Sequence, residues 1–305
     1  MLKINKINKS YDSRVLKDID LEINEGELVA ILGENGSGKT TLMKIICDIV
    51  IADSGYILYE NKPFIKKNLR DITMLLEGNR NFYNELTILE NIKYLYRIKG
   101  FQFDNHSYNR LEYISDLFNL TPYLNTQLYK LSRGTLQKIS LLLNFILPSK
   151  VIVLDEPTLG LDANTREKFI ELIKNEISFN NKIILITTHH LEILEKLNCR
   201  LVVLDDGEIK YDGTSVKFLD EFSSQLIEIE YKNNDFIKNK SFKNGLEKYK
   251  YKIDGNKIVI YLNNQDSIDI RYFTNNVEVI SYKKIQSNLE ETYRKFRDNL
   301  TNREI

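Results

Sequence analysis

Apolar residues fall into two kinds of run along the chain, and each kind predicts a different element. Continuous apolar runs occupy 28–32 and 151–154, and a third lies within 182–188. Such runs are typical of strands in a parallel sheet that is covered on both faces. Residues 2–23 instead alternate in short segments, which predicts an antiparallel sheet with one solvated face. The pattern therefore indicates an α/β protein that also contains an antiparallel β subdomain.

A region of helical periodicity, about 86–148, separates the first buried strand from the second. Thr87 and Glu90 form a T-x-x-E capping box, which predicts that a helix begins there. We expect Ser107 to cap a second helix, and we expect a third helix over 135–147. The region is therefore interpreted as a helical subdomain inserted into the α/β domain.

The pattern changes again after about residue 225. Short segments with alternating faces follow one another, joined by Asn, Asp and Gly turns, and the last helical stretch covers 288–297. We therefore expect a large α/β domain over 1–222 and a small accessory α+β domain over 226–305.

The sequence GENGSGKT follows the buried strand at 28–32 and leads into a helical pattern. Strand, glycine-rich loop and helix are the context that the phosphate-loop pattern G-x-x-x-x-G-K-[ST] requires. A chance glycine-rich turn is the alternative, and both flanks argue against it. Lys39 can reach the outer phosphates of a nucleotide, and the Thr40 hydroxyl is placed for Mg²⁺. The residues expected to hold the nucleotide here are Gly33, Asn35, Gly36, Ser37, Gly38, Lys39, Thr40 and Thr41.

Two acids, Asp155 and Glu156, directly follow the buried strand at 151–154. Ligands of open α/β sheets gather at the carboxyl edge of the strands, so both acids are expected beside the phosphate loop. Asp155 can meet Mg²⁺ directly or through water, and Glu156 can take a proton from an attacking water. A surface turn with two solvated acids is the alternative.

Two further residues are candidates because of where they lie. His189 follows the buried strand in 182–188, so its imidazole could bond the terminal phosphate and the attacking water. A lone histidine is ordinarily structural, and only its place in the series of motifs favours a role. Tyr11 lies about twenty residues before the phosphate loop, where an aromatic ring could stack on adenine, although a chain with 18 tyrosines has many in structural positions.

Composition and the apolar runs indicate which partners and which cellular location to expect. Lys+Arg and Asp+Glu are both 43 in 305 residues, so no overall charge favours nucleic acid or an anionic membrane surface. The longest apolar run, 139–147, is shorter than the roughly 18 residues of a membrane span. No signal-peptide pattern occurs at the start, so we expect a cytoplasmic protein. Cys47 and Cys199 are interpreted as buried, reduced thiols.

The order of motifs, with LSRG at 131–134, VIVLDEP at 151–157, GLD at 160–162 and TTH at 187–189, resembles that of the ATP-binding cassette (ABC) ATPases over 1–222. The resemblance implies the ABC-type P-loop NTPase fold and two ATP molecules held between two cassettes that pack head to tail. The second cassette would be another copy of this chain or a homologous cassette.

The resemblance also assigns roles to individual residues. Ser132 and Gly134 match the signature positions that hold the γ-phosphate of ATP bound to the partner cassette. Asp162 matches the loop that communicates across the dimer, and His189 matches the γ-phosphate switch. The family implies that Tyr11 stacks on adenine. The resemblance gives Asp155 the metal-side role and Glu156 the role of general base.

The chain departs from the family pattern at three positions. Thr135 stands where the signature often has Gln, and Arg133 stands where it often has Gly. Glu77 stands where the family usually has the Gln that contacts Mg²⁺ and the attacking water. A carboxylate can still coordinate Mg²⁺, but it adds negative charge beside Asp155 and Glu156. The stretches LLEGNRNFY and SNLEETYRKF nonetheless resemble the drug-exporter branch.

These features predict an ATPase subunit that drives a separate integral membrane permease and is peripheral to the inner face of the cell membrane. The expected transporter is an exporter of drug, peptide or lipid-like cargo, and no nucleic-acid partner is expected. One alternative is a soluble ABC ATPase that acts on ribosomes or DNA. Another is a regulatory cassette that binds ATP without driving transport, although the intact Lys39, Asp155, Glu156 and His189 favour hydrolysis.

Overall fold

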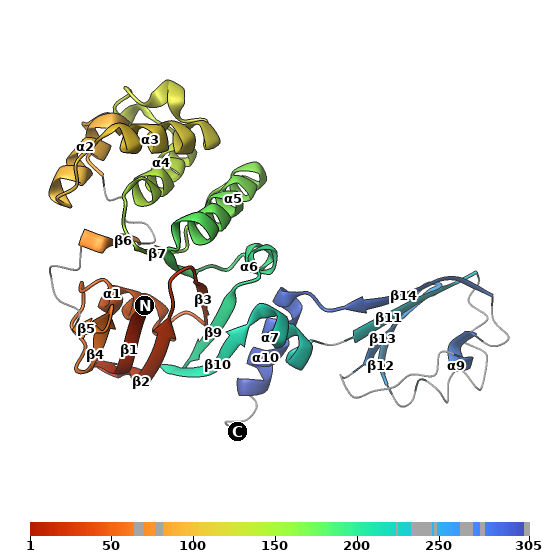
Figure 1. Ribbon diagram of the computed structural model, residues 1–305. Helices are drawn as coiled ribbons and strands as arrows, with labels where there is room; N and C mark the ends of the chain where they lie inside the picture. Colours follow the sequence, from red (N-terminus) through yellow and green to blue (C-terminus); the bar gives the residue numbers. More distant parts are fainter. Residues whose placement is uncertain are drawn as a thin grey trace. The chain divides into compact units, whose positions relative to one another are not determined.

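The computed structural model consists of two compact units, Met1–Thr214 and Ser215–Ile305 (Figure 1). Each unit is described by itself, and the domain boundary expected between 222 and 226 stays a prediction. The structure describes residues 1–63, 70–76, 82–223, 225–232, 246, 249–262, 271–274 and 278–301.

The first unit begins with a four-stranded antiparallel sheet in the order β2-β1-β4-β5. Apolar side chains on one face of this sheet, including Leu2, Ile4 and Leu21, are buried in a core shared with the larger sheet of the unit. The alternation along 2–23 therefore predicted this element correctly. The strands are β1 (Leu2–Ser10), β2 (Arg14–Ile23), β4 (Ser54–Tyr59) and β5 (Lys62–Pro63).

The second sheet of this unit has six strands in the order β10-β9-β3-β8-β7-β6. All its neighbouring pairs are parallel except β10 with β9, which are antiparallel. Every residue of β3, β7 and β8 is buried, as their continuous apolar runs predicted. The strands are β3 (Leu28–Leu32), β6 (Ile72–Leu75), β7 (Val151–Asp155), β8 (Ile183–Thr187), β9 (Arg200–Asp205) and β10 (Glu208–Thr214).

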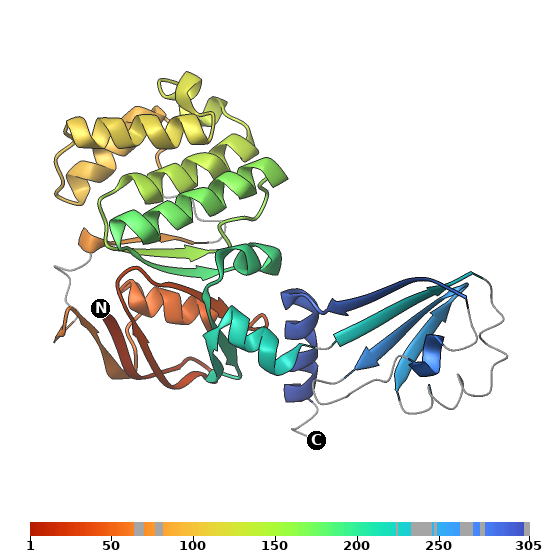
Figure 2. The same ribbon diagram turned by 45° about the vertical axis from the view of Figure 1, so that its right-hand side comes forward.

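Helices cover the six-stranded sheet, and others form the helical subdomain that was expected over about 86–148. Figure 2 shows α4 and α5 side by side over one face of the sheet, with α2 and α3 lying beyond them. The helices are α1 (Lys39–Ile46), α2 (Ile88–Ile98), α3 (Asn105–Leu117), α4 (Arg133–Ile146), α5 (Ala163–Asn180) and α6 (Leu191–Leu197), with 3₁₀ turns η2 (Thr121–Tyr123) and η3 (Leu128–Lys130).

The helix starts test the capping predictions. The capping box of Thr87 and Glu90 is present at α2, with both reciprocal hydrogen bonds formed. The prediction that Ser107 caps the second helix is wrong, because Asp104 is the N-cap of α3. The backbone N–H and the hydroxyl of Ser107 both donate to Asp104 Oδ1, each at 2.9 Å. Asp and Ser are similarly good caps, and the charged carboxylate three residues earlier accepts both bonds.

The second unit is built on a four-stranded antiparallel sheet in the order β12-β13-β11-β14. One face carries a core that includes Ile229, Tyr231, Ile260 and Phe273. Across the described parts of both units, no helix is long and apolar enough to cross a membrane. The elements are α7 (Ser215–Phe222), β11 (Gln225–Tyr231), β12 (Lys250–Asp254), β13 (Lys257–Leu262), α9 (Arg271–Thr274), β14 (Val279–Gln286) and α10 (Leu289–Thr301).

Candidate nucleotide-binding site

The glycine-rich loop joins the carboxyl end of β3 to the start of α1, and its shape depends on residues without side chains. Gly38 has φ +103°, a conformation that other residues adopt only with strain. A Cβ atom there would lie 2.7 Å from Leu16 Cδ2 and 2.8 Å from the Val15 carbonyl oxygen. The loop can therefore pass close to β2 only with glycine at this position.

Two features of the loop favour an anionic ligand. No side chain caps the N-terminus of α1, and its first turn carries no acid, so the amides there remain available. The Ser37 hydroxyl is buried and has no hydrogen-bond partner among the described residues. A buried hydroxyl without a partner is costly unless a ligand or water completes it. The loop therefore suits a phosphate group.

Lys39 lies across this loop. Its Nζ donates to the carbonyl oxygens of Gly33 at 2.9 Å and Glu34 at 2.8 Å. Burial lowers the pKa of the Lys39 ammonium, and the carboxylates of Glu156, Asp155 and Glu34 oppose that shift. The ammonium is thus partly desolvated and is held by two neutral carbonyl groups. A phosphate oxygen would replace these bonds with charge-assisted ones.

A chain of hydrogen bonds connects the loop to the two acids. The Thr40 hydroxyl donates to Asp155 Oδ2 at 3.0 Å. The Thr187 hydroxyl donates to Asp155 Oδ1 at 2.7 Å and accepts from the Glu156 backbone N–H at 3.0 Å. The start of α1 and the carboxyl ends of β7 and β8 are therefore tied together at one edge of the sheet. Thr187 was missed from the sequence because a threonine that ends a buried strand carries no distinguishing signal.

Glu156 has an unusual backbone. Its φ of +49° lies in the left-handed region, which costs a non-glycine residue about 1–3 kcal/mol. This conformation turns the side chain toward His189, whose backbone N–H donates to Oε2 at 3.2 Å and whose Nε2 lies 3.5 Å from Oε1. The carboxyl group is nearly buried, with 8% of the residue exposed. Strain at such a position is typical of functional sites, where the surrounding structure holds it.

These groups line one cavity of about 310 Å³. Most residues that the sequence grouped as candidates meet there, although Gly33 and Ser37 form the loop without lining it. Tyr11 is 58% exposed, and the Lys9 ammonium lies 5.3 Å from the centre of its ring. The lining residues are Tyr11, Val15, Asn35, Gly36, Gly38, Lys39, Thr40, Thr41, Asp155, Glu156 and His189.

The donor set of this cavity fits Mg²⁺ that arrives with a nucleotide. Mg²⁺ in proteins is usually held by one or two carboxylates together with substrate phosphates and water. The Thr40 hydroxyl and the Asp155 carboxylate converge on one point, as such a site requires. In the described part of the chain, no group of three or more His, Cys, Asp or Glu residues could hold a metal by itself. Glu77, expected as a further ligand, lies outside the described residues.

Three predicted site residues lie away from this cavity. Ser132 caps α4, and its hydroxyl accepts from the Thr135 N–H at 3.2 Å. A Cβ atom at Gly134, in the first turn of α4, would meet nothing within 4 Å. Asp162 caps α5, and its Oδ1 accepts from the Thr165 N–H at 2.8 Å. Within one chain these residues do not line the nucleotide cavity, so their expected roles stay predictions.

We expect Thr187→Val to weaken Mg²⁺ use without preventing nucleotide binding. The substitution keeps the shape of the side chain but removes the bond that orients Asp155. Loss of a supporting bond of this kind typically costs about 10- to 100-fold in metal affinity or activity. The measurement is the Mg²⁺ dependence of ATP hydrolysis, together with ATP binding without Mg²⁺.

Thr188→Val is the matched control, because the Thr188 hydroxyl is also buried but bonds Thr158 and the His190 N–H instead of the acids. Equal Mg²⁺ dependence in the two variants would show that Thr187 serves only the packing of this edge.

Comparison with known proteins agrees with this site. The family model described as "ABC transporter" matches residues 16–159. The chain is 35% identical over 237 residues to the ABC transporter ATP-binding protein YtrB of Bacillus subtilis, covering 75% of this chain and 76% of YtrB. It is 28% identical over 298 residues to the spermidine/putrescine import ATP-binding protein PotA of Spiroplasma citri, covering 93% and 82%.

Solved structures show the same fold. The ATP-binding cassette MJ0796, in a dimeric post-hydrolysis state bound to ADP and Pi, superposes with a TM-score of 0.63 at 26% identity. The superposition covers 70% of this chain and 98% of that cassette. The predicted P-loop fold of ABC type is therefore confirmed. This chain belongs to the family of ATP-binding subunits of ABC transporters.

Proposed function

We propose that two copies of this chain, or one copy and a homologous cassette, close head to tail over two Mg²⁺–ATP molecules and hydrolyse them. The observation that carries the proposal is the meeting of Lys39, Asp155 and Glu156 in one cavity at the carboxyl edge of the sheet. A cation for the phosphates, an acid on the metal side and a second acid for water are the parts that phosphoryl transfer needs.

The geometry supports a division of roles between the two acids. Asp155 is held on both oxygens by the hydroxyls of Thr40 and Thr187, so it is fixed beside the loop. Bound Mg²⁺ would neutralise charge on the phosphates. Glu156 is held by the His189 backbone N–H and faces the same cavity, where it can accept a proton from water attacking the γ-phosphate. His189 would then sense the terminal phosphate while contacting the base.

In the proposed dimer, the partner chain supplies contacts to the γ-phosphate that the cavity of one chain does not provide. We propose that Ser132 and Gly134 face the γ-phosphate of ATP bound to the partner, with the N-terminus of α4 directed at it. A 14-residue helix with an uncrowded glycine in its first turn suits an approaching anion. The proposed role of Asp162, at the N-terminus of α5, is communication across the same interface.

We propose further that hydrolysis drives a separate integral membrane permease, and that the cassette is cytoplasmic and bound to the inner face of the membrane through it. The proposed direction is export of a drug, peptide or lipid-like cargo. This direction rests on the resemblance of LLEGNRNFY and SNLEETYRKF to the drug-exporter branch. The relatives named above include an import protein, so membership of the family alone does not assign a direction.

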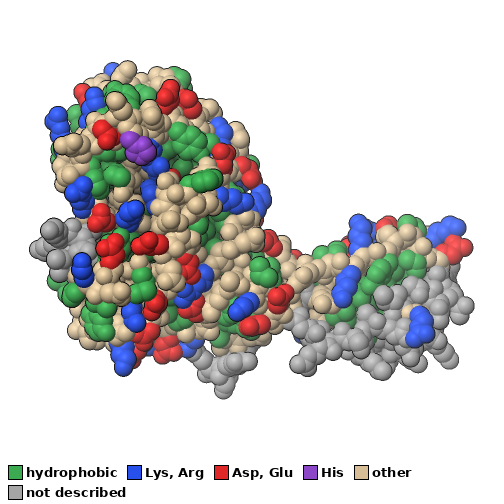
Figure 3. Space-filling view, in the orientation of Figure 1, with side chains coloured by type: hydrophobic (Ala, Val, Ile, Leu, Met, Phe, Trp, Pro, Cys, Tyr) green, Lys and Arg blue, Asp and Glu red, His purple; other side chains and the backbone are tan. Residues whose placement is uncertain are grey.

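A soluble or regulatory ABC ATPase without a permease is the second candidate. An ABC ATPase of this kind that acts on nucleic acid is expected to carry a basic patch on its surface. Figure 3 shows Lys and Arg side chains interleaved with Asp and Glu over the visible face of the first unit, without a large patch of one sign. The distribution of charge on that face therefore favours a permease partner over nucleic acid.

We expect Glu156→Gln to abolish steady-state ATP hydrolysis while preserving ATP binding. The amide keeps the size of the side chain but cannot accept the proton, a loss that typically costs about 10²- to 10⁴-fold. Because ATP is then not consumed, the variant is expected to accumulate as a dimer that sedimentation detects only with ATP. The same change at Glu192, an acid on α6 that pairs with Arg166, is the control. Undiminished hydrolysis by Glu156→Gln would contradict the assignment of the base.

Coupling to a permease predicts where the protein is found in cells. We expect the chain in the membrane fraction when its permease partner is co-expressed, and in the soluble fraction when the partner is absent. Immunoblotting of the two fractions measures this. Recovery with ribosomes, with or without the permease, would favour the soluble ABC ATPase instead.

A further inference from the structure

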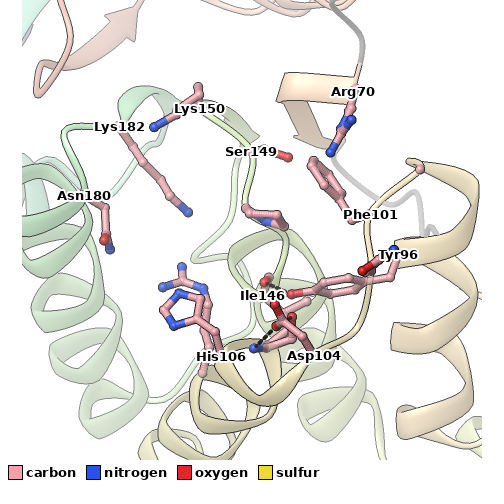
Figure 4. A pocket seen from close by; sticks show the side chains of 15 residues that line it. Arg70, Tyr96, Phe101, Asp104, His106, Ile146, Ser149, Lys150, Asn180 and Lys182 are labelled. Carbon is pink, nitrogen blue, oxygen red and sulfur yellow. Dashed lines mark hydrogen bonds between the residues drawn. The ribbon is translucent and has the colours of Figure 1, made fainter.

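A second and larger cavity, of about 620 Å³, lies at the opposite edge of the six-stranded sheet. Its walls come from residues that precede β6, β7 and β8, from the segment that joins α2 to α3, and from the start of α3 (Figure 4). The nucleotide site uses the carboxyl ends of β3, β7 and β8, so none of its residues takes part in this second cavity. Nothing in the proposed ATPase mechanism requires it.

The sheet brings three cations to this edge. Arg70, Lys150 and Lys182 stand one or two positions before the first residues of β6, β7 and β8, which are neighbours in the sheet. The ladder continues through them, because Lys150 N–H donates to the Asp71 carbonyl at 2.8 Å and Ile183 N–H donates to the Lys150 carbonyl at 2.9 Å. Adjacent strands are about 4.8 Å apart, so these side chains start close together. All three line the cavity.

Among the described residues that line this cavity, positively charged side chains outnumber acidic ones. One buried carboxylate, Glu176, is shared by two cations: Arg110 contacts its Oε1 at 2.7 Å and Lys182 contacts its Oε2 at 2.8 Å. Asp104 also lines the cavity, but its carboxylate accepts the capping bonds of α3. His106 adds a further ring that can carry charge. Arg70 and Lys150 therefore supply positive charge that the facing acids do not balance.

A buried hydroxyl lies among these cations. Ser149 is fully buried, lines the cavity, and its Oγ has no hydrogen-bond partner among the described residues. Figure 4 shows the Ser149 hydroxyl directed toward Arg70 and Phe101, and the Lys182 ammonium directed toward His106. A buried hydroxyl is normally paired, so its orientation toward a cationic space indicates a missing acceptor. An anion with several oxygens would supply that acceptor and neutralise the charge together.

The ionisation of Lys182 agrees with this assignment. Burial, together with the positive charges of Arg110 and Lys150, lowers the pKa of Lys182 to about 8, although Glu176 opposes the shift. An anion in the cavity would stabilise the ammonium and raise that pKa.

We propose that this cavity is a binding site for a small phosphorylated metabolite, separate from the site for ATP. The cations and Ser149 would hold its phosphate group. The side lined by Phe101 and Tyr96 leaves room for an organic part, since the cavity has about twice the volume of the nucleotide cavity. The Arg70 guanidinium lies 4.3 Å from the centre of the Phe101 ring, which places it beside that part of the ligand.

The test measures binding of inorganic phosphate to the full chain carrying Lys39→Ala, which weakens binding at the glycine-rich loop. Calorimetry in a buffer without other oxyanions is expected to show saturable binding. Adding Ser149→Ala removes one hydrogen bond and is expected to weaken binding about two- to tenfold. Adding Lys150→Gln instead removes a charge-assisted contact and is expected to weaken it by about tenfold or more.

Lys93→Gln, in the same background, is the matched control: Lys93 is an exposed lysine of α2 that does not line the cavity. It is expected to leave phosphate binding unchanged. Absence of saturable binding, or equal affinity in the Ser149, Lys150 and Lys93 variants, would overturn the proposal. Because the readout is phosphate binding and not hydrolysis, neither result bears on the proposed ATPase function.

Discussion

The parallel arrangement of β3, β8 and β7 is the constraint on which the nucleotide site depends. Parallel neighbours bring their carboxyl ends to one edge, so the loop after β3 and the acids at the end of β7 meet although more than a hundred residues separate them. The hydroxyls of Thr40 and Thr187 then join these ends through Asp155. Complete burial of the three strands makes their register costly to change, because every side chain would lose its packing.

The same arrangement explains why the two edges of the sheet differ. At the carboxyl edge, backbone amides and Lys39 face two acids, which suits a phosphate that carries a metal ion. At the amino edge, Arg110 and Lys182 share the carboxylate of Glu176, and Arg70 and Lys150 add further positive charge, which suits an anion without a metal. Strand polarity thus places two chemically distinct sites at opposite edges of the same six-stranded sheet. Helices α4 and α5 lie over one face of that sheet, between the two edges.

Local patterns could be read from the sequence, and contacts through space could not. The phosphate loop and the acids after β7 were predictable because strand, turn and helix signals adjoin them. Thr187 and the ion pair of Arg110 with Glu176 were not, since Arg110 and Glu176 are 66 positions apart and come together only in the folded chain. The error at α3 has a local cause: two capping residues compete three positions apart, and a pattern does not rank them.

The most direct test of the account is a structure of Glu156→Gln with Mg²⁺ and ATP. The account predicts two chains related head to tail, with each triphosphate in the loop before α1 of one chain. Ser132 and Gly134 of the other chain would then lie within hydrogen-bond distance of its γ-phosphate. A monomer, or a dimer in which the start of α4 faces away from the partner's triphosphate, would contradict it.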